Sequence, residues 1–293
     1  MNQINLDSHL QNNLQKIVTY LEDVFPGQGE IKVSVNDLET NTFCSVNGKN
    51  TGWAASIIKL PVMLYVLDCV DKGNMSLFDS IEVNHKYMLE FYDFTSRQPD
   101  GTKMHINNLI YHMIVESDNE ATNLLVDHLG IKEFNNYMCS LGMNKTMLGH
   151  LLCPKVPRYT AEFNEDGSNI TCTDDMNVCL RQIYDCSFSK LSIETREMAK
   201  SYMELTSSSV LKRGCFSSSK VNSKIGVIFD TECGGDNHEV GIVDDRFVVS
   251  LMVNKIKTPF QLGRLDLLKE KPVNYLNMVN KYVVETIGRY YYG

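Results

Sequence analysis

The sequence contains no hydrophobic run long enough to cross a membrane. A transmembrane helix needs roughly 18 or more consecutive apolar residues, and no segment of the 293 residues comes close to that length. The first 25 residues also lack the basic start and the continuous apolar stretch of a secretory signal peptide. From the sequence as given we expect a cytoplasmic protein, or a secreted one if a leader preceded it and was removed.

Positive charge is scarce and scattered. The chain has 28 lysines and arginines against 36 aspartates and glutamates, which gives a formal net charge of −8. The basic residues form no stripe, whereas a protein that binds nucleic acid or an anionic membrane gathers them on one face. We therefore expect neither nucleic acid nor a membrane as partner, and predict a monomer that acts on a small molecule or a peptide.

The cysteines form no recognisable zinc or disulfide framework. There are nine of them, an odd number, and none has the Cys-x-x-Cys spacing typical of a zinc site. Unpaired cysteines usually behave as small buried hydrophobes, so we expect buried thiols, no metal and no cofactor. Cys172, Cys179 and Cys186 recur every seven residues, which predicts one shared helical face.

The secondary-structure patterns of the chain follow a clear order, with strands near both ends and helices between them. Strand patterns cover Glu30–Val35, Thr42–Val46, Lys224–Asp230, Val240–Asp244 and Arg246–Asn254. Helical patterns cover residues 1–25, Ile57–Lys72, Ile106–Val115, Asn119–Leu129, Ile131–Leu141, Thr173–Asp185 and Val273–Tyr290. Residues Leu151–Asn169 contain two prolines and little periodicity, which predicts a long loop.

This order predicts an α/β fold of the α+β sandwich kind. One antiparallel sheet would be assembled from both chain ends and flanked by the N- and C-terminal helices. An all-helical lobe would be inserted into it. We expect residues 1–50 and 206–293 to form the first lobe and residues 51–205 the second, as one discontinuous two-lobe unit.

A serine and a lysine three residues apart are the first candidates for chemistry. Ser56 and Lys59 share one helical face, and a serine hydroxyl becomes a good nucleophile only when a neighbouring base takes its proton. The same spacing also occurs at Ser187/Lys190, Ser209/Lys212 and Ser217/Lys220. The surroundings distinguish Lys59, because the helix after it is apolar nearly all round and predicts burial. Burial would lower the pKa of the lysine, which suits a base.

Two further motifs follow in the chain. Ser117-Asp118-Asn119 lies between two helical patterns, where an ordinary helix N-cap is the simpler interpretation. Lys224-Ile225-Gly226 opens a predicted strand, where a lysine is usually a solvated charge. Each motif alone is weak.

Together and in this order, the three motifs resemble those of the superfamily of class A β-lactamases and penicillin-binding proteins. Similarity to family sequence extends beyond the motifs, through Ala54–Val83, Asn108–Thr146, Asn169–Met176 and Val240–Asn254. The resemblance covers nearly the whole chain. It implies a serine hydrolase that needs no cofactor and acts on a β-lactam or on an amide or ester of a D-amino acid.

The resemblance also implies roles for particular residues. Ser56 would be acylated, Lys59 would help to remove its proton, and Ser117 would relay a proton to the leaving nitrogen. Asn119 would contact the substrate amide, and Lys224 would attract a substrate carboxylate. The oxyanion hole would consist of the N–H groups of Ser56 and of Val227, the residue after Gly226. Tyr92 is a candidate for an aromatic wall beside the substrate, and Asp118 is interpreted as structural.

Two departures from the family pattern keep alternatives open. Ile225 stands where the family has a hydroxyl residue, and no acid occurs in Lys155–Arg158, where the family's β-lactamases carry the glutamate that activates water for deacylation. Glu162 and Glu165 lie in the same loop but match the spacing poorly, with Glu162 the weak substitute. A peptidase or esterase on the same scaffold is therefore one alternative. A penicillin-binding or sensing protein that acylates without turnover is another, and an inactive descendant is the third.

Overall fold

The computed structural model describes most of the chain. The described residues are 5–24, 29–85, 93–152, 168–206, 211–212, 218–228, 235–256 and 272–292. The chain divides into two compact units. The first comprises Met1–Ile57, Cys172–Leu180 and Ser208–Gly293, and the second comprises Ile58–Thr171 and Arg181–Ser207. These units differ from the predicted lobes mainly at residues 51–57 and 172–180, which belong with the sheet and not with the helices.

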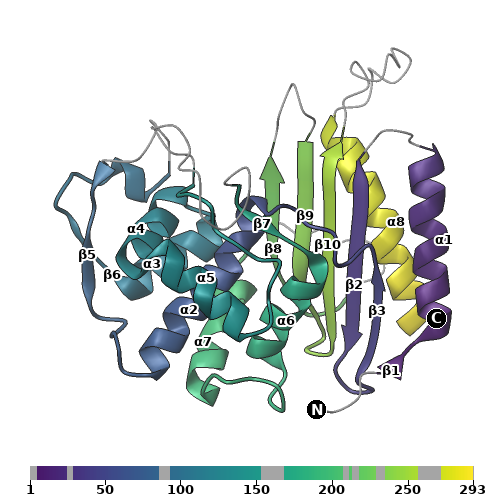
Figure 1. Cartoon of the computed structure of the whole chain (residues 1–293), viewed down its shortest axis with the longest axis horizontal. Coiled ribbons are helices and arrows are strands. Elements are labelled where there is room, and N and C mark those ends of the chain that lie inside the picture. Colours follow the sequence, from purple (N-terminus) through teal and green to yellow (C-terminus); the bar gives the residue numbers. More distant parts are fainter. Residues whose placement is uncertain are drawn as a thin grey trace. The chain divides into compact units, whose positions relative to one another are not determined.

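The first unit is built on a six-stranded sheet with the order β1-β3-β2-β10-β9-β8. The strands are β1 (Asn5–Leu6), β2 (Glu30–Asp37), β3 (Thr42–Val46), β8 (Val221–Ile228), β9 (Gly235–Val243) and β10 (Phe247–Ile256). Figure 1 shows β2 from the start of the chain beside β10 from its end. The predicted sheet is thus confirmed, with one correction. The short β1 pairs with β3 in parallel and precedes the first helix, which the sequence pattern had extended over it.

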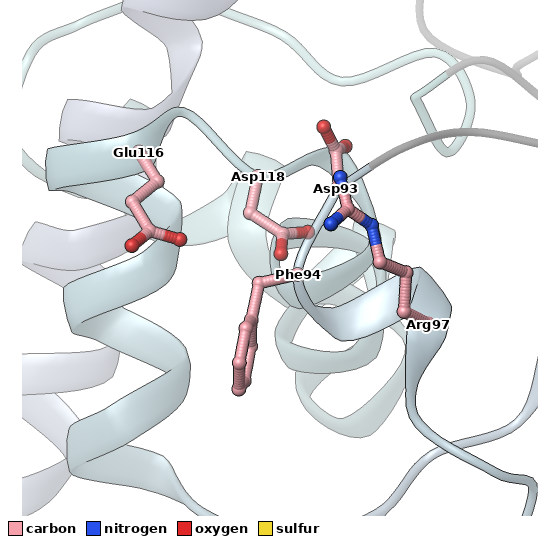
Figure 2. Close-up of a pocket in the computed structure, with 5 residues that line it drawn as sticks. All are labelled: Asp93, Phe94, Arg97, Glu116 and Asp118. Atoms are coloured by element: carbon pink, nitrogen blue, oxygen red, sulfur yellow. The ribbon is translucent and has the colours of Figure 1, made fainter.

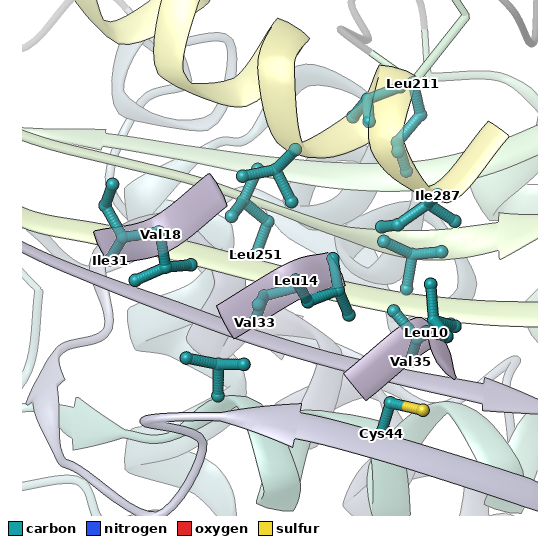
Figure 3. Close-up of a cluster of buried hydrophobic side chains, with 14 of the residues drawn as sticks. Leu10, Leu14, Val18, Ile31, Val33, Val35, Cys44, Leu211, Leu251 and Ile287 are labelled. Atoms are coloured by element: carbon teal, nitrogen blue, oxygen red, sulfur yellow. The ribbon is translucent and has the colours of Figure 1, made fainter. Parts of the chain in front are cut away.

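Two helices cover one face of this sheet. They are α1 (Ser8–Val24) and α8 (Pro272–Tyr292), which lie side by side in Figure 1. Leu10, Leu14 and Val18 repeat every four residues, so one stripe of α1 faces the sheet. In Figure 3 this stripe packs with Val33 and other branched side chains of β2 and β10. The flanking N- and C-terminal helices are as predicted.

The opposite face of the sheet is also buried, although it is polar. Lys32, Ser34 and Asn36 alternate with the apolar residues of β2, yet each is at most 1% exposed. The hydroxyl of Ser34 lies 2.8 Å from that of Thr173 and donates to Asp174 at 2.6 Å, both at the start of α6 (Thr173–Tyr184). This contact explains why residues 172–180 belong to the first unit.

The second unit is mainly helical, but the predicted all-helical lobe is wrong in one respect, because the unit also contains short strands. Its elements are α2 (Lys59–Asp71), α3 (Ile106–Tyr111), the π-helical turn η4 (His112–Glu116), α4 (Asn119–Leu129), α5 (Ile131–Ser140), α7 (Ile193–Glu204), the turn η3 (Thr95–Arg97), the paired strands β5 (Ser80–Glu82) and β6 (Lys103–His105), and the short strand β7 (Ile170–Thr171). The sequence pattern missed α7, which begins where the Ser192 side chain accepts a hydrogen bond from the Thr195 N–H. No helix in these described ranges or those of the first unit is long and apolar enough to cross a membrane.

Some of the described cysteines are buried, as predicted, and others are exposed. Cys44, Cys69, Cys172 and Cys179 are buried, and burial raises the pKa of the Cys44 thiol to about 11. Cys186 does not share the face of Cys172 and Cys179, because α6 ends at Tyr184 and Cys186 is exposed. The predicted seven-residue helical face is therefore wrong at its last member.

Candidate active site

Ser56 lies in the first unit, directly after a strained residue, Ala55. The short strand β4 (Gly52–Trp53) leads into the 3₁₀ turn η1 (Ala55–Ile58). Ala55 has a φ of 45°, in the left-handed region that residues with a β-carbon rarely occupy. The predicted helix over Ile57–Lys72 therefore consists of η1 followed by α2, and Ser56 lies in the tighter first turn.

Strand β8 approaches the backbone of Ser56 closely at Gly226. A β-carbon placed on Gly226 would lie 2.9 Å from the backbone nitrogen of Ser56 and equally close to that of Ile57. Only glycine fits there without movement of the backbone. Val227, the next residue of the strand, is 37% exposed. The two predicted oxyanion donors are thus on neighbouring segments of one unit.

Lys224 shares the strand face of Gly226. Residues two apart on a strand point the same way, so Lys224 and Gly226 lie on one face of β8. Lys224 is only 3% exposed, and its Nζ donates to the Ile225 carbonyl at 3.1 Å. β8 ends the strand order of the described sheet. The lysine is therefore not the solvated edge charge that a lone strand lysine usually is.

Lys59 is the central residue among the candidate site residues of the second unit. It opens α2 and is completely buried, as the apolar surroundings in the sequence predict. Its Nζ donates to the Ser117 carbonyl at 2.6 Å, to Asn119 Oδ1 at 2.7 Å and to Ser117 Oγ at 3.2 Å. A buried ammonium group needs such acceptors, since leaving it unpaired costs several kcal/mol.

The geometry of the Ser117-Asp118-Asn119 turn assigns the cap to its middle residue. Ser117 ends the π-helical turn η4 in the left-handed conformation, with a φ of 59°. Asp118 caps α4, because its carboxylate accepts from the Ala121 N–H at 2.9 Å and from the Thr95 N–H at 2.8 Å. Asp118 is structural, as predicted. The side chains on either side of it, Ser117 and Asn119, both contact Lys59.

A hollow of about 280 Å³ adjoins this turn. Figure 2 shows the residues that line it, which are Asp93, Phe94, Arg97, Glu116 and Asp118. Asp93 Oδ2 accepts from the Asn119 N–H at 2.9 Å, and the exposed Phe94 stacks on His112. Sequence reasoning missed Asp93 and Phe94, because neither belongs to a motif. Their nearest signal was the neighbouring Tyr92.

Several predicted site residues lie outside the described residues. They are Tyr92, the segment Lys155–Arg158 and the loop acids Glu162 and Glu165. The other candidates fall into two groups. Ser56, Lys224, Gly226 and Val227 belong to the first unit, and Lys59, Ser117 and Asn119 belong to the second. The groups adjoin in the sequence, because the first unit's segment ends at Ile57 and the second unit begins at Ile58.

The first unit thus holds the backbone of Ser56 against β8, and the second unit holds a buried lysine between a serine and an asparagine. The chain was also compared with known proteins. The sequence model of the Beta-lactamase enzyme family matches residues 10–267, and the chain belongs to that family.

Solved structures of this fold match the chain over nearly its full length. The acyl-enzyme complex of a PBP-A mutant with penicillin G has a TM-score of 0.75 and 19% identity, over 99% of this chain and 100% of that one. A β-lactamase from Chitinophaga pinensis has a TM-score of 0.75 and 18% identity, over 95% and 99%. An ancestral class A β-lactamase has a TM-score of 0.74 and 19% identity, over 96% and 100%. At these identities the likeness shows the fold.

One curated relative is similar over a shorter stretch. The β-lactamase VEB-1 of Pseudomonas aeruginosa is 31% identical over 77 residues. The match covers 26% of this chain and 26% of VEB-1, so it spans about a quarter of the relative's length.

Proposed function

We propose that this chain is a serine hydrolase of the class A β-lactamase type, which is acylated on Ser56 and hydrolyses a β-lactam or a related amide. The observation that carries the proposal is the buried Lys59 side chain, held by Ser117 and Asn119 and three residues along the chain from Ser56. A lysine that only carries surface charge would remain exposed to solvent. A lysine that transfers protons is useful when it is buried beside these acceptors.

The proposed reaction begins with attack of Ser56 Oγ on the substrate carbonyl. Lys59, as a neutral amine, takes the hydroxyl proton, and the N–H groups of Ser56 and Val227 donate to the developing oxyanion. Ser117 passes a proton to the leaving nitrogen as the amide bond breaks. Asn119 contacts the substrate amide. Lys224 supplies positive charge for a substrate carboxylate.

Deacylation separates the leading proposal from a second candidate. Lys155–Arg158 contains no acid to activate water, and Ile225 lacks the hydroxyl that would bind a substrate carboxylate. The missing acid favours slow turnover, and Ile225 favours a substrate other than a penicillin or a cephalosporin. A penicillin-binding or sensing protein that remains acylated is therefore the second candidate, and a peptidase or esterase on the same scaffold is related to it. In each case Ser56 forms the covalent bond.

Intact-protein mass spectrometry tests the proposal directly. The protein is mixed with a penicillin and with a chromogenic cephalosporin, and adduct mass and product absorbance are followed together. A transient adduct with steady product supports hydrolysis, and a persistent adduct without product supports the second candidate. Absence of any adduct, with peptide and ester substrates also left intact, contradicts both.

Gly226→Ala is expected to slow acylation about 10²–10³-fold, the usual cost of losing one oxyanion donor. The added methyl group would lie 2.9 Å from the backbone nitrogens of Ser56 and Ile57, so that backbone must shift. Gly235→Ala on the neighbouring strand is the control, because its nearest contact is a single carbonyl at 3.1 Å. Stopped-flow acylation kinetics measure the effect. Equal rates for the two variants would show that the approach of β8 to Ser56 is unimportant.

A further inference from the structure

A row of residues crosses the sheet beneath the segment that leads to Ser56. Gly226 on β8 is opposite His238 on β9, His238 is opposite Met252 on β10, and Met252 is opposite Lys32 on β2. Residues directly opposite in a sheet point to the same face. All four therefore belong to the polar face, away from α1 and α8. Gly226 at one end of the row is the residue that touches the Ser56 backbone.

Three side chains of this face hold the main chain of Thr51 and Trp53. Lys32 Nζ donates to the Thr51 carbonyl at 2.9 Å. The Trp53 carbonyl accepts two hydrogen bonds, from His238 Nε2 at 2.8 Å and from Asn254 Nδ2 at 3.2 Å. Lys32 also donates to Asn254 Oδ1 at 2.8 Å, which joins the three side chains into one network.

The network is buried, so its hydrogen bonds are costly to lose. Lys32 is 1% exposed, Asn254 4% and His238 0%. A buried carbonyl that loses its donor costs about 1–3 kcal/mol in general. Burial lowers the pKa of Lys32, and Glu30 is its carboxylate partner at 3.2 Å. A methionine at position 32 would fill similar space without the cost of burying a charge. The presence of a lysine therefore indicates a role beyond packing.

His238 has one defined hydrogen-bonding state. The Trp53 carbonyl can only accept, so Nε2 carries the proton, and Nδ1 accepts from the Val253 N–H at 3.3 Å. The imidazole is thus neutral. Burial lowers its pKa to about 4, and the nearby charge of Lys32 acts in the same direction.

The held segment is short and closely fitted. A β-carbon on Gly52, between the two held carbonyls, would lie 2.2 Å from Asn254 Oδ1, so the network approaches the backbone directly. Two residues after Trp53 comes Ala55 in its left-handed conformation, and Ser56 follows. A strained residue persists only where its surroundings fix the chain on both sides. Gly226 constrains the chain after Ala55, at Ser56, and the network constrains the chain before it, at Thr51–Trp53.

We propose that Lys32, Asn254 and His238 are positioning residues for the nucleophile, which hold Thr51–Trp53 so that Ala55 stays left-handed and Ser56 Oγ stays aligned. The assignment rests on the proposed function, because it presumes that Ser56 is acylated. None of the three touches the substrate. They act through the backbone, where an error of about 1 Å can cost about 100-fold in rate.

The test compares Lys32→Met and His238→Leu with a matched control. Each removes a donor to the held segment at roughly constant volume. Ser250→Ala is the control, because Ser250 is buried on the same face of β10 but bonds to Asn177, away from Thr51–Trp53. We expect the acylation rate constant of both variants to fall roughly 10–100-fold, with the apparent substrate affinity little changed. Ser250→Ala should acylate at the wild-type rate.

A spectroscopic readout makes the test independent of activity. Trp53 is the single tryptophan of the chain, so fluorescence excited at wavelengths where tyrosine does not absorb reports on the held segment. We expect Lys32→Met and His238→Leu to shift the emission maximum, whereas Ser250→Ala leaves it unchanged. His238→Gln can still donate to the Trp53 carbonyl and should restore most of the acylation rate and the wild-type emission.

The pH dependence of acylation and of Trp53 emission distinguishes the effect of His238 from the effects of its charged neighbours. These are Lys32 with its partner Glu30, and Asp236, which lies on the same strand face and whose pKa burial raises. Because the folded pKa of His238 is below the ordinary value, its contribution to stability is complete above about pH 6.5 and is lost as the pH falls towards 4. Acylation and Trp53 emission of the folded protein should change together near pH 4, where the imidazole becomes protonated and Nδ1 can no longer accept from the Val253 N–H. In His238→Gln the part of the change that belongs to His238 should vanish, and any remainder belongs to Asp236.

The outcomes distinguish the two proposals. If the wild-type chain is never acylated, the proposed function fails, and the fluorescence data alone show whether the network holds the segment. If the wild type is acylated and Lys32→Met and His238→Leu match its rate and its emission, the positioning proposal is overturned. The same follows if Ser250→Ala slows acylation as much as they do.

Discussion

Ser56→Ala should abolish covalent labelling by every acylating probe. The variant keeps the backbone N–H that serves as an oxyanion donor but has no oxygen to form the ester bond. Intact-protein mass spectrometry should therefore detect only unmodified protein after long incubation with a penicillin that labels the wild type. Because Ser56 is partly exposed in a 3₁₀ turn, loss of one hydroxyl should leave the free energy of unfolding nearly unchanged.

Ser187→Ala provides the matched control. Ser187 has the same spacing to a lysine, Lys190, but both side chains are exposed, and the Ser187 hydroxyl donates to Asp185. It should label like the wild type. Full labelling of Ser56→Ala would assign the nucleophile to another residue and remove the mechanism proposed above.

Lys59→Met is the second change with a large expected effect. We expect the acylation rate constant to fall about 10²–10⁴-fold, the range in which a general base contributes. Methionine fills similar space in the apolar surroundings of α2 but can neither take a proton nor donate to Ser117 and Asn119. Three acceptor atoms then lose their donor, while the cost of burying the polar amine disappears. These terms oppose each other, so the protein should still fold, as circular dichroism and thermal melting would show.

Lys190→Met is the control for this change, because its Nζ is at the surface and bonds to the Ser140 carbonyl at 3.3 Å. Rapid-quench kinetics with the same penicillin compare the two variants. If Lys59→Met and Lys190→Met both acylate at the wild-type rate, the base lies elsewhere, and Lys59 holds the Ser117-Asp118-Asn119 turn for structural reasons alone.

Local signals in the sequence predicted the helices well where caps and apolar spacing agreed. Helix α4 has the predicted bounds, Asn119–Leu129, because Asp118 caps its start and Gly130 follows its end. The burial of Lys59 followed from the apolar residues that surround it in sequence. α7 was missed, since its mean hydropathy is low and the only strong local signal was the cap at Ser192.

Sequence patterns could not predict contacts that depend on the register between distant strands. A one-residue shift of β9 against β8 would move His238 to the other face of the sheet. The row of opposite residues from Lys32 to Gly226 could therefore not be predicted from the sequence, where its members are scattered over almost the whole chain. The hydrogen bond that Asp93 accepts from the Asn119 N–H was also hidden, because it joins a residue before η3 to the first residue of α4.

The sequence by itself determined most of the long helices and strands, the helical insertion into a sheet made from both chain ends, and the order of the three motifs, because each of these depends on neighbouring residues. Only the tertiary structure decided that Asp118 and not Ser117 caps α4, that Lys59 bonds to Ser117 and Asn119, and that Gly226 lies against the backbone of Ser56. These contacts join segments far apart in the chain, and their geometry follows from packing and strand register, which no local pattern specifies.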